Sequence, residues 1–351
     1  MATPTSRDVL ASMPVYKPGR VALDEAHKLS SNELPYPPLP SVLERLAGEL
    51  GRINRYPDAG NTALVERLSQ ALGQPAESFA ASTGSVAVLY SLLSAYCSPG
   101  DEVVYAWRSF EAYPIAVGLA GARSVGVPLT ADGRHDLDAM AAAVTDRTKV
   151  VMVCTPNNPT GPVVEHDALV RFVDALPPQV LVVVDEAYVE FVRDPAAARG
   201  LDVLEGRPNV VVLRTFSKAY GLAGLRVGYA VAHPLVAQEI RKVVAPFSVS
   251  GVAQAAAIAS LDAADELAAR VDAVVAERTR LRDALLEAGF EVPEAQGNFV
   301  WLPLGDDALD FAEAVAPVSV RPFAGDGVRV SVGLPEADDH FLGLAKAWRE
   351  R

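Results

Sequence analysis

The chain has 351 residues, of which 50% are hydrophobic and 21% are charged, so it has enough apolar material for a buried core. It carries 31 Lys and Arg against 44 Asp and Glu, and the net charge of −13 argues against a general affinity for nucleic acid or anionic membranes. No apolar run approaches the roughly 20 residues of a membrane span, and the N-terminus has no signal-peptide pattern. We therefore expect a soluble cytoplasmic protein.

Seven prolines among the first 40 residues set this segment apart from the rest of the chain. They forbid a continuous helix and predict an extended arm, residues 1–40, laid over a surface. Apolar helical segments then alternate with short strand-like runs at residues 149–154, 180–184, 209–213 and 226–231. Runs that are apolar at consecutive positions are typical of strands buried on both faces of a parallel sheet. We expect a large α/β domain over residues 41–246.

After Pro246 the pattern changes. Residues 251–289 predict a nearly continuous helix, 299–302 and 328–332 predict strands, and 340–349 lie in a last helix. A small α+β domain, residues 247–351, is therefore expected. Cys97 and Cys154 stand in apolar surroundings without zinc-site or disulfide spacing, so we expect two buried thiols and no metal site.

Polar residues follow several of the predicted strands. Asp185 comes directly after the apolar run 180–184, and Lys218 follows the strand 209–213 by a few residues. A buried strand-end carboxylate is costly unless a donor or cation meets it, and ligands of parallel sheets bind at such strand ends. Taken singly, Asp185 is also compatible with a helix cap, and Lys218 with an ordinary solvated lysine.

Two further stretches complete the pattern. Asn158 lies in a loop with two prolines and a glycine after the strand 149–154, where it offers an amide donor. Ser85 and Val86 open an apolar helix, whose free N–H groups and positive dipole end suit a phosphate. A lysine for an imine, a carboxylate for a pyridinium nitrogen and an anion cradle are together what pyridoxal 5'-phosphate needs.

The motifs and their order resemble those of fold-type I pyridoxal-phosphate aminotransferases, and most closely the histidinol-phosphate aminotransferase subfamily. The resemblance covers almost the full chain. The matching stretches are Asp185-Glu186-Ala187-Tyr188, Ser217-Lys218-Ala219-Tyr220-Gly221 with Arg226, and Asn158-Pro159-Thr160-Gly161. It implies a large domain with a mixed, mostly parallel sheet between helices, and a small α+β domain at the C-terminus.

The resemblance also implies roles for single residues. Lys218 matches the lysine that forms a Schiff base with the cofactor and then shuttles the substrate proton. Asp185 matches the carboxylate that keeps the pyridine nitrogen protonated, and Asn158 and Tyr188 match the donors to the ring oxygen. Phe110 falls where family members stack an aromatic ring on the cofactor, whereas nearby Trp107 and Tyr113 read as ordinary aromatic core.

The cofactor phosphate and the substrate are assigned in the same way. The residues that match phosphate ligands are Ser85, Val86, Thr215, Ser217 and Arg226. Tyr56 matches a tyrosine that reaches the cofactor of the neighbouring subunit, which implies a homodimer with shared sites. Arg329 matches the arginine that binds the substrate carboxylate, Asn298 is a candidate second contact, and Tyr16 and Asn32 are candidates to line the side-chain pocket.

The substrate is less firmly indicated than the reaction. Residues 107–114, 214–229 and 253–267 are more similar to the aromatic-amino-acid aminotransferase branch, so we expect transfer of an amino group between an aromatic L-amino acid and 2-oxoglutarate. Histidinol-phosphate transamination is the main alternative. The family often has a Pro-Glu-Glu-Asn segment, where this chain reads Pro335-Glu336-Ala337-Asp338; an Asp338 that faces the pocket would disfavour a phosphate dianion, and the orientation of His340 is equally open.

Two other readings are compatible with the cofactor motifs. A related fold-type I enzyme could decarboxylate an amino-acid phosphate, but Arg329 favours a reaction in which the carboxylate is held and kept. A non-catalytic sensor attached to a DNA-binding module would need a basic segment, and nothing basic of that kind precedes residue 40.

Overall fold

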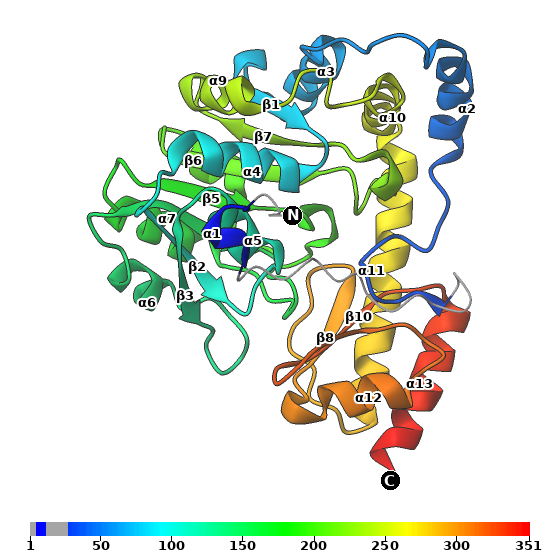
Figure 1. The fold of residues 1–351 in the computed structure, drawn as a ribbon. Helices are drawn as coiled ribbons and strands as arrows, with labels where there is room; N and C mark the ends of the chain where they lie inside the picture. Colours follow the sequence, from blue (N-terminus) through cyan, green and yellow to red (C-terminus); the bar gives the residue numbers. More distant parts are fainter. Residues whose placement is uncertain (1–4, 12–26) are drawn as a thin grey trace.

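The computed structural model describes residues 5–11 and 27–351. The chain folds around two sheets, a seven-stranded one in the upper part of the molecule and a three-stranded one below it (Figure 1). A long helix, α11 (Ala264–Glu287), runs alongside both. Within the described part of the chain, no helix is long and apolar enough to cross a membrane.

The large sheet has the strand order β1-β7-β6-β5-β4-β2-β3. Strands β2 to β6 run parallel to their neighbours among themselves, whereas β7 is antiparallel to both β1 and β6. This confirms the predicted mixed, mostly parallel sheet. The strands are β1 (Phe79–Ser82), β2 (Glu102–Trp107), β3 (Arg123–Pro128), β4 (Thr148–Cys154), β5 (Leu181–Asp185), β6 (Val210–Thr215) and β7 (Gly228–Ala232).

The central strands β4, β5 and β6 consist almost entirely of apolar residues that are buried on both faces. Their register places Cys154 beside Asp185, and Asp185 beside Leu213. The carboxyl ends of three parallel strands therefore meet at one edge of the sheet, and each strand delivers its following loop there. Cys154 and Cys97 are both buried and free, as predicted.

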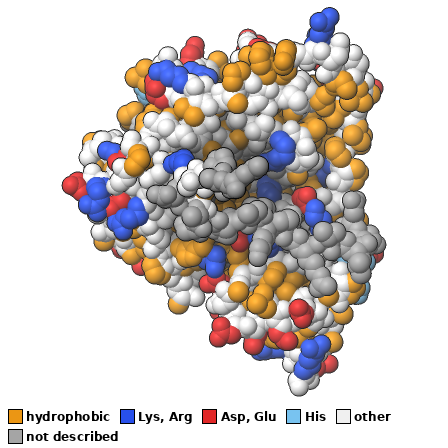
Figure 2. Space-filling view, in the orientation of Figure 1, with side chains coloured by type: hydrophobic (Ala, Val, Ile, Leu, Met, Phe, Trp, Pro, Cys, Tyr) orange, Lys and Arg blue, Asp and Glu red, His pale blue; other side chains and the backbone are white. Residues whose placement is uncertain are grey.

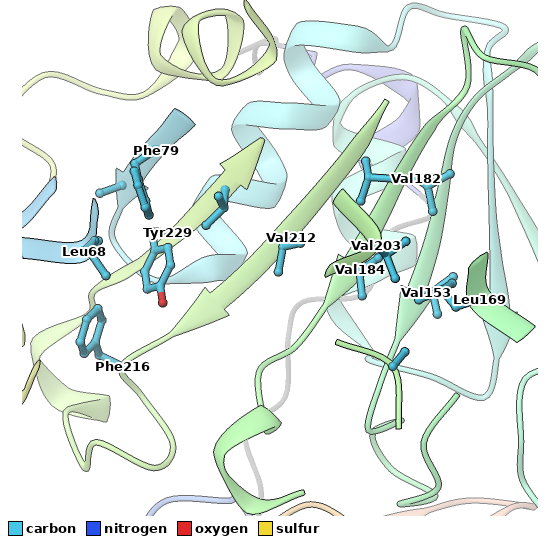
Figure 3. Packing of buried hydrophobic residues seen from close by; sticks show 14 of the residues in the cluster. Leu68, Phe79, Val153, Leu169, Val182, Val184, Val203, Val212, Phe216 and Tyr229 are labelled. Carbon is cyan, nitrogen blue, oxygen red and sulfur yellow. The ribbon is translucent and has the colours of Figure 1, made fainter. Parts of the chain in front are cut away.

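Helices cover both faces of this sheet. On one face, residues of α3, α7 and α10 pack with β5, β6 and β7, and Figure 3 shows Val184 of β5 near Val203, and Val153 of β4 near Leu169. On the other face, α4, α5 and α9 pack against the same strands. The helices of the large layer are α2 (Pro40–Glu49), α3 (Thr62–Leu72), α4 (Ser85–Tyr96), α5 (Ala112–Leu119), α6 (Leu137–Ala142), α7 (His166–Ala175), α8 (Gly200–Leu204), α9 (Pro234–Val243) and α10 (Gly251–Asp262).

The small sheet is antiparallel, with the order β8-β10-β9. It packs against α11 and the two last helices around a separate apolar cluster. Its strands and the last helices are β8 (Phe299–Leu302), β9 (Arg321–Phe323), β10 (Gly327–Ser331), α12 (Ala308–Ala314) and α13 (Pro335–Arg349). Short 3-10 turns lie at Leu50–Arg52, Ala76–Ser78, Val189–Phe191, Ala223–Leu225 and Gly305–Asp307, and α1 (Asp8–Ala11) is a single turn near the N-terminus.

One helical prediction needs correction. The helix predicted over 251–289 is broken at Ala263, whose φ of −93° and ψ of 40° are not helical. The break lets α10 pack on the large sheet while Val271 and Val274 of α11 pack near Phe299 of the small one. The last helix begins at Pro335, because proline suits the first helical turn.

The segment that follows residue 26 joins the two sheets. Leu29 donates its N–H to the carbonyl of Ser319, and Ser331 donates its N–H to the carbonyl of Leu29, so residues 28–32 lie along the small sheet. The domain limits 1–40, 41–246 and 247–351 remain a prediction. Helix α10 falls in the predicted range 247–351, and it shares its apolar cluster with the large sheet.

Candidate active site

A cavity of about 290 Å³ lies where the carboxyl ends of β4, β5 and β6 face the small sheet. Eleven of the residues singled out from the sequence line it, which are Ser85, Val86, Phe110, Asn158, Asp185, Tyr188, Thr215, Ser217, Lys218, Arg226 and Arg329. They come from helix, strand and loop segments that are far apart in the chain. The described residues hold no group of three or more His, Cys, Asp or Glu side chains arranged to bind a metal.

Asp185 is the last residue of β5, and its carboxylate is buried. The two carboxylate oxygens differ in their hydrogen bonds. Its Oδ2 atom accepts a hydrogen bond of 2.8 Å from the hydroxyl of Tyr113. Its Oδ1 atom is buried and has no hydrogen-bond partner among the described residues. Burial raises the pKa of Asp185 to about 6, against the lowering effect of the Tyr113 hydroxyl and the nearby N–H of Ala187. Oδ1 is therefore available to a donor that enters the cavity.

Lys218 lies in the turn after β6, with its amino group in the same cavity. Its Nζ atom donates to the carbonyl of Ser31 at 3.0 Å. Burial lowers the pKa of Lys218 to about 7, and the positive charges of Arg329 and Arg226 act in the same direction while Glu33 opposes them. A lysine with such a pKa is a nucleophile and a proton carrier at neutral pH.

An anion cradle lies beside Lys218. The first N–H groups of α4, at Ser85 and Val86, have no acceptor inside the helix and carry the positive end of its dipole. Arg226 packs against the turn before them. The Nη2 atom of Arg226 lies only 2.7 Å from the place that a Cβ atom at Gly84 would occupy. Gly84 has a φ of +89°, and this backbone conformation favours glycine. Arg226 donates to the Ser217 hydroxyl at 3.0 Å.

Arg329 of β10 stands at the opposite wall of the cavity. Its Nη1 atom donates to Oδ1 of Asn158, and its Nη2 atom donates to the carbonyl of Ser30, both at 2.6 Å. Asn158 therefore keeps its amide N–H groups for another acceptor. Tyr188 is buried, and its hydroxyl accepts a hydrogen bond of 3.0 Å from Asn32.

Three predicted residues of the described part of the chain are not brought to the cavity wall. Asn32 supports Tyr188 from behind, and Asn298 donates to the carbonyl of Asn32 at 3.1 Å, so both lie one layer away. Tyr56 is 83% exposed and stacks on Phe247 with ring centroids 4.7 Å apart. Tyr16 lies outside the described residues.

Asp338 does not line the cavity. It is fully buried, and both of its carboxylate oxygens accept hydrogen bonds from the N–H of Gly333, at 3.0 and 3.2 Å. Burial raises the pKa of Asp338, and a contact with Glu277 acts in the same direction. The carboxylate therefore holds the loop after β10 and is not in place to repel a substrate. His340 is also away from the cavity, with its Nδ1 atom 3.2 Å from Nε2 of His27.

Sequence reasoning missed several residues of the site. Tyr113 was predicted to be ordinary core, and it is fully buried, but it also binds Asp185. The sequence signal that could have placed Tyr113 near the cavity was its position three residues after Phe110. Glu111 and Arg321 line the cavity and form an ion pair, with 2.7 Å between Nη2 of Arg321 and Oε2 of Glu111. No local pattern links them, because they meet only through the pairing of distant elements.

Comparison with known proteins agrees with this geometry. The family model described as aminotransferase class I and II matches residues 24–339. The chain belongs to this family. Proteins named aromatic amino acid aminotransferase from Streptomyces avermitilis and Thermobifida fusca are 57% and 53% identical to it, each over 99% of this chain and 98% of the relative.

Solved structures confirm the fold of this aminotransferase. A histidinol-phosphate aminotransferase from Sinorhizobium meliloti, in complex with pyridoxal-5'-phosphate, superposes with a TM-score of 0.91 at 29% identity, and the match covers 99% of this chain and 98% of the other. A structure titled putative histidinol-phosphate aminotransferase, from Erwinia carotovora, gives a TM-score of 0.86 at 26% identity and covers 92% and 96%. The predicted fold type I is thus confirmed.

Aminotransferases of this fold use pyridoxal phosphate, and the cavity suits that cofactor. The Oδ1 atom of Asp185, which has no hydrogen-bond partner in the described part of the chain, can accept from a protonated ring nitrogen. The α4 N-terminus and Arg226 provide donors and positive charge for a phosphate. The lowered pKa of Lys218 suits attack on an aldehyde.

The pKa of Lys218 predicts how the stability of the cofactor-free protein changes with pH. Free lysine has a pKa of 10.5, so the unfolded chain binds more protons than the folded chain between about pH 7 and 10.5. The free energy of unfolding therefore gains a rising contribution across this window, and the Lys218→Met substitution removes it. Urea midpoints of both proteins at several pH values measure the difference.

The stabilising effect of Lys218→Met should be largest at pH 7 and should shrink toward pH 10.5. Lys242→Met serves as the control, since Lys242 is a surface lysine paired with Glu239 and its replacement leaves Lys218 in place. An equal slope in wild type and Lys218→Met would contradict the buried, cation-flanked lysine.

The hydrogen bond from Tyr113 predicts a second effect. Tyr113→Phe removes the donor to Asp185 and so weakens its charged form, and a hydrogen bond to a charged group contributes about 1.5–3 kcal/mol. We expect the affinity of the cofactor-free protein for pyridoxal phosphate to fall by about tenfold or more. Tyr105→Phe, another buried tyrosine of the same apolar cluster, is the control. Similar losses in the two variants would show that packing, not the bond to Asp185, matters.

Proposed function

We propose that the protein transfers an amino group between an aromatic L-amino acid and 2-oxoglutarate. One observation carries the reaction type, namely that Lys218, with its lowered pKa, shares a cavity with Arg329 and with an oxygen of Asp185 that has no hydrogen-bond partner among the described residues. The aromatic substrate is supported by relatives at 53–57% identity that are named aromatic amino acid aminotransferase. Phe110 and Phe323 line the cavity and offer apolar contacts to a ring.

Several residues would hold the cofactor. Lys218 is its proposed covalent anchor, and Asp185 would keep a proton on the ring nitrogen. Asn158 and Tyr188 would donate to the ring oxygen, and Phe110 would contact the ring face. The phosphate would be bound by Ser85, Val86, Thr215, Ser217 and Arg226. When bound, pyridoxal phosphate supplies a carbonyl carbon for the substrate amine and a ring that accepts electrons from Cα.

Lys218 would move the substrate proton. It would take the proton from the substrate Cα and deliver it to C4′ of the cofactor, and a pKa near 7 permits transfer in both directions. Asp185 keeps its negative charge through the hydrogen bond from Tyr113. Arg329 would bind the substrate carboxylate with two parallel hydrogen bonds, a geometry that guanidinium groups favour.

We further propose a homodimer in which Tyr56 reaches the cofactor of the partner subunit. Tyr56 and Ile53 are 83% and 71% exposed, and Phe247 beside Tyr56 is also exposed. Hydrophobic side chains gather on the side of the molecule where α2 and α10 lie (Figure 2). An exposed apolar surface of this kind is typical of a protein interface.

The substrate proposal predicts that the holoenzyme prefers an aromatic amino acid to histidinol phosphate, and parallel half-reactions measure this preference. L-phenylalanine should change the cofactor absorbance of the holoenzyme rapidly, and L-histidinol phosphate should react with a second-order rate constant at least about tenfold lower. Lys218→Ala should respond to neither. A preference for histidinol phosphate, for which the solved neighbours are named, would contradict the aromatic substrate. Absence of any change with phenylalanine, histidinol phosphate and glutamate would contradict transamination.

The dimer proposal predicts complementation between two variants. Mixed dimers of Lys218→Ala and Tyr56→Phe subunits contain one site with both Lys218 and the Tyr56 of the other subunit. At limiting cofactor, the mixture should therefore be more active than the sum of the separate variants. The measurement is transaminase activity after the two proteins have exchanged subunits. Activity that merely equals the sum would place Tyr56 in its own subunit's site or outside any site.

A further inference from the structure

Three consecutive residues of the segment that lies along the small sheet contact the proposed cofactor and substrate residues. The carbonyl of Ser30 accepts from Arg329 at 2.6 Å, and the carbonyl of Ser31 accepts from Nζ of Lys218 at 3.0 Å. Asn32 donates from Nδ2 to the hydroxyl of Tyr188 at 3.0 Å. The first two contacts use backbone atoms that any residue has, whereas the third depends on the side chain of Asn32.

The backbone of Asn32 is held in place from two sides. The residue is fully buried, and its φ of +54° lies in the left-handed region, which asparagine tolerates better than most residues. Its N–H donates to Oγ of Ser331 at 2.8 Å, and its carbonyl accepts from Nδ2 of Asn298 at 3.1 Å. Ser331 is the last residue of β10, so the small sheet fixes the position of Asn32.

The contact with Ser331 also fixes which way the amide of Asn32 faces. The hydroxyl oxygen of Ser331 accepts from the N–H of Asn32, and the hydroxyl donates its own proton to Oδ1 of Asn32 at 2.8 Å. Turning the amide over would leave this proton of buried Ser331 without an acceptor among the described residues. The Nδ2 atom of Asn32 therefore faces Tyr188.

This arrangement determines where the proton of the Tyr188 hydroxyl goes. A tyrosine hydroxyl has one proton, and its oxygen here accepts from Asn32, so the proton has no acceptor among the described residues. Tyr188 lines the cavity, and its ring packs edge-to-face on Phe299 with centroids 5.1 Å apart. Burial raises the pKa of Tyr188 to about 12, while the charge of Arg329 and the hydrogen bond from Asn32 act to lower it. The hydroxyl is thus free to donate to an acceptor inside the cavity.

We propose that Asn32, oriented by Ser331, is a positioning residue that directs the hydroxyl of Tyr188 as a donor toward the ring oxygen of the cofactor. The proposal rests on the function given above and deepens it. Asn32 does not line the cavity, so it acts through Tyr188 and not on the cofactor itself. This role differs from the place in the side-chain pocket that the sequence suggested for Asn32.

The expected effect follows from the charge of the ring oxygen. A donor to that oxygen stabilises its negative charge, so the nearby nitrogen of Lys218, once bound to the cofactor, loses its proton at a lower pH. Removing the amide of Asn32 takes away both the orientation of the Tyr188 hydroxyl and its polarisation by a second hydrogen bond. The midpoint of the change in cofactor absorbance with pH should therefore rise.

The test is a pH titration of the cofactor absorbance of the holoenzyme, without substrate. Tyr188→Phe should raise the midpoint by about 1–2 units, the equivalent of one hydrogen bond to a charged group. Asn32→Gly, which suits the φ of +54°, should raise it by about 0.5–1 unit. Asn32→Asp keeps the shape but offers an acceptor to Tyr188, so its rise should at least match that of Tyr188→Phe.

Two controls separate positioning from a general effect on the fold. In Asn32→Gly/Tyr188→Phe, the midpoint should equal that of Tyr188→Phe alone, because Asn32 acts through the hydroxyl. Asn61→Gly should leave the midpoint unchanged. Asn61 is also buried and has a similar φ of +52°, but it does not line the cavity or contact Tyr188.

Three results would overturn the proposal: midpoints in both Asn32 variants within about 0.2 units of wild type, an equal rise in Asn61→Gly, or a rise from Asn32→Gly that persists in the Tyr188→Phe background. The half-reaction of wild type with phenylalanine is a separate readout. Its failure would contradict the proposed function, whereas the titration, which uses no substrate, would still report on Asn32.

Discussion

A carboxylate buried at the end of a central strand is the constraint on which the rest of the site depends. Asp185 lies buried where β5 ends, and removing a carboxylate from water costs several kcal/mol unless donors or cations replace it. Tyr113 supplies one donor, and the other oxygen has none among the described residues. A protonated ring nitrogen in the cavity would complete the environment of Asp185, so the cofactor and the folded chain stabilise each other.

The large sheet determines where the partners of that carboxylate stand. Because β4, β5 and β6 are parallel and in register, the loops that carry Asn158, Asp185 and Lys218 leave the sheet at one edge. The antiparallel strand β7 then starts close to α4, since a Cβ atom at Gly228 would collide with the backbone nitrogen of Ser85. This close approach joins the phosphate cradle to the lysine loop. The small sheet contributes the arginines from the other side.

The sequence predicted the parts of the site that follow directly from a strand. Asp185, Lys218 and Asn158 each come soon after a buried apolar run, and such runs are visible in the chain alone. Ser85 and Val86 were predictable because a glycine precedes an apolar helix. The family resemblance added Arg226 and Arg329, whose importance no local pattern reveals.

Other parts could not be predicted, because they depend on pairing between distant segments. Arg321 belongs to a strand of three residues, and its position opposite Arg329 follows only from the register of β9 with β10. The sequence left open whether Asp338 faces the pocket, because its carboxylate binds the backbone of Gly333, a contact that depends on how α13 begins. The break at Ala263 likewise reflects where two helices pack, not a local breaker residue.

The most direct test of this account is the protonation state of the cofactor ring nitrogen, measured by ¹⁵N NMR on holoenzyme that carries labelled pyridoxal phosphate. The account predicts a nitrogen that stays protonated in wild type through neutral pH and loses its proton in Asp185→Asn. An unprotonated nitrogen in wild type, or the same signal in both proteins, would contradict the role of Asp185.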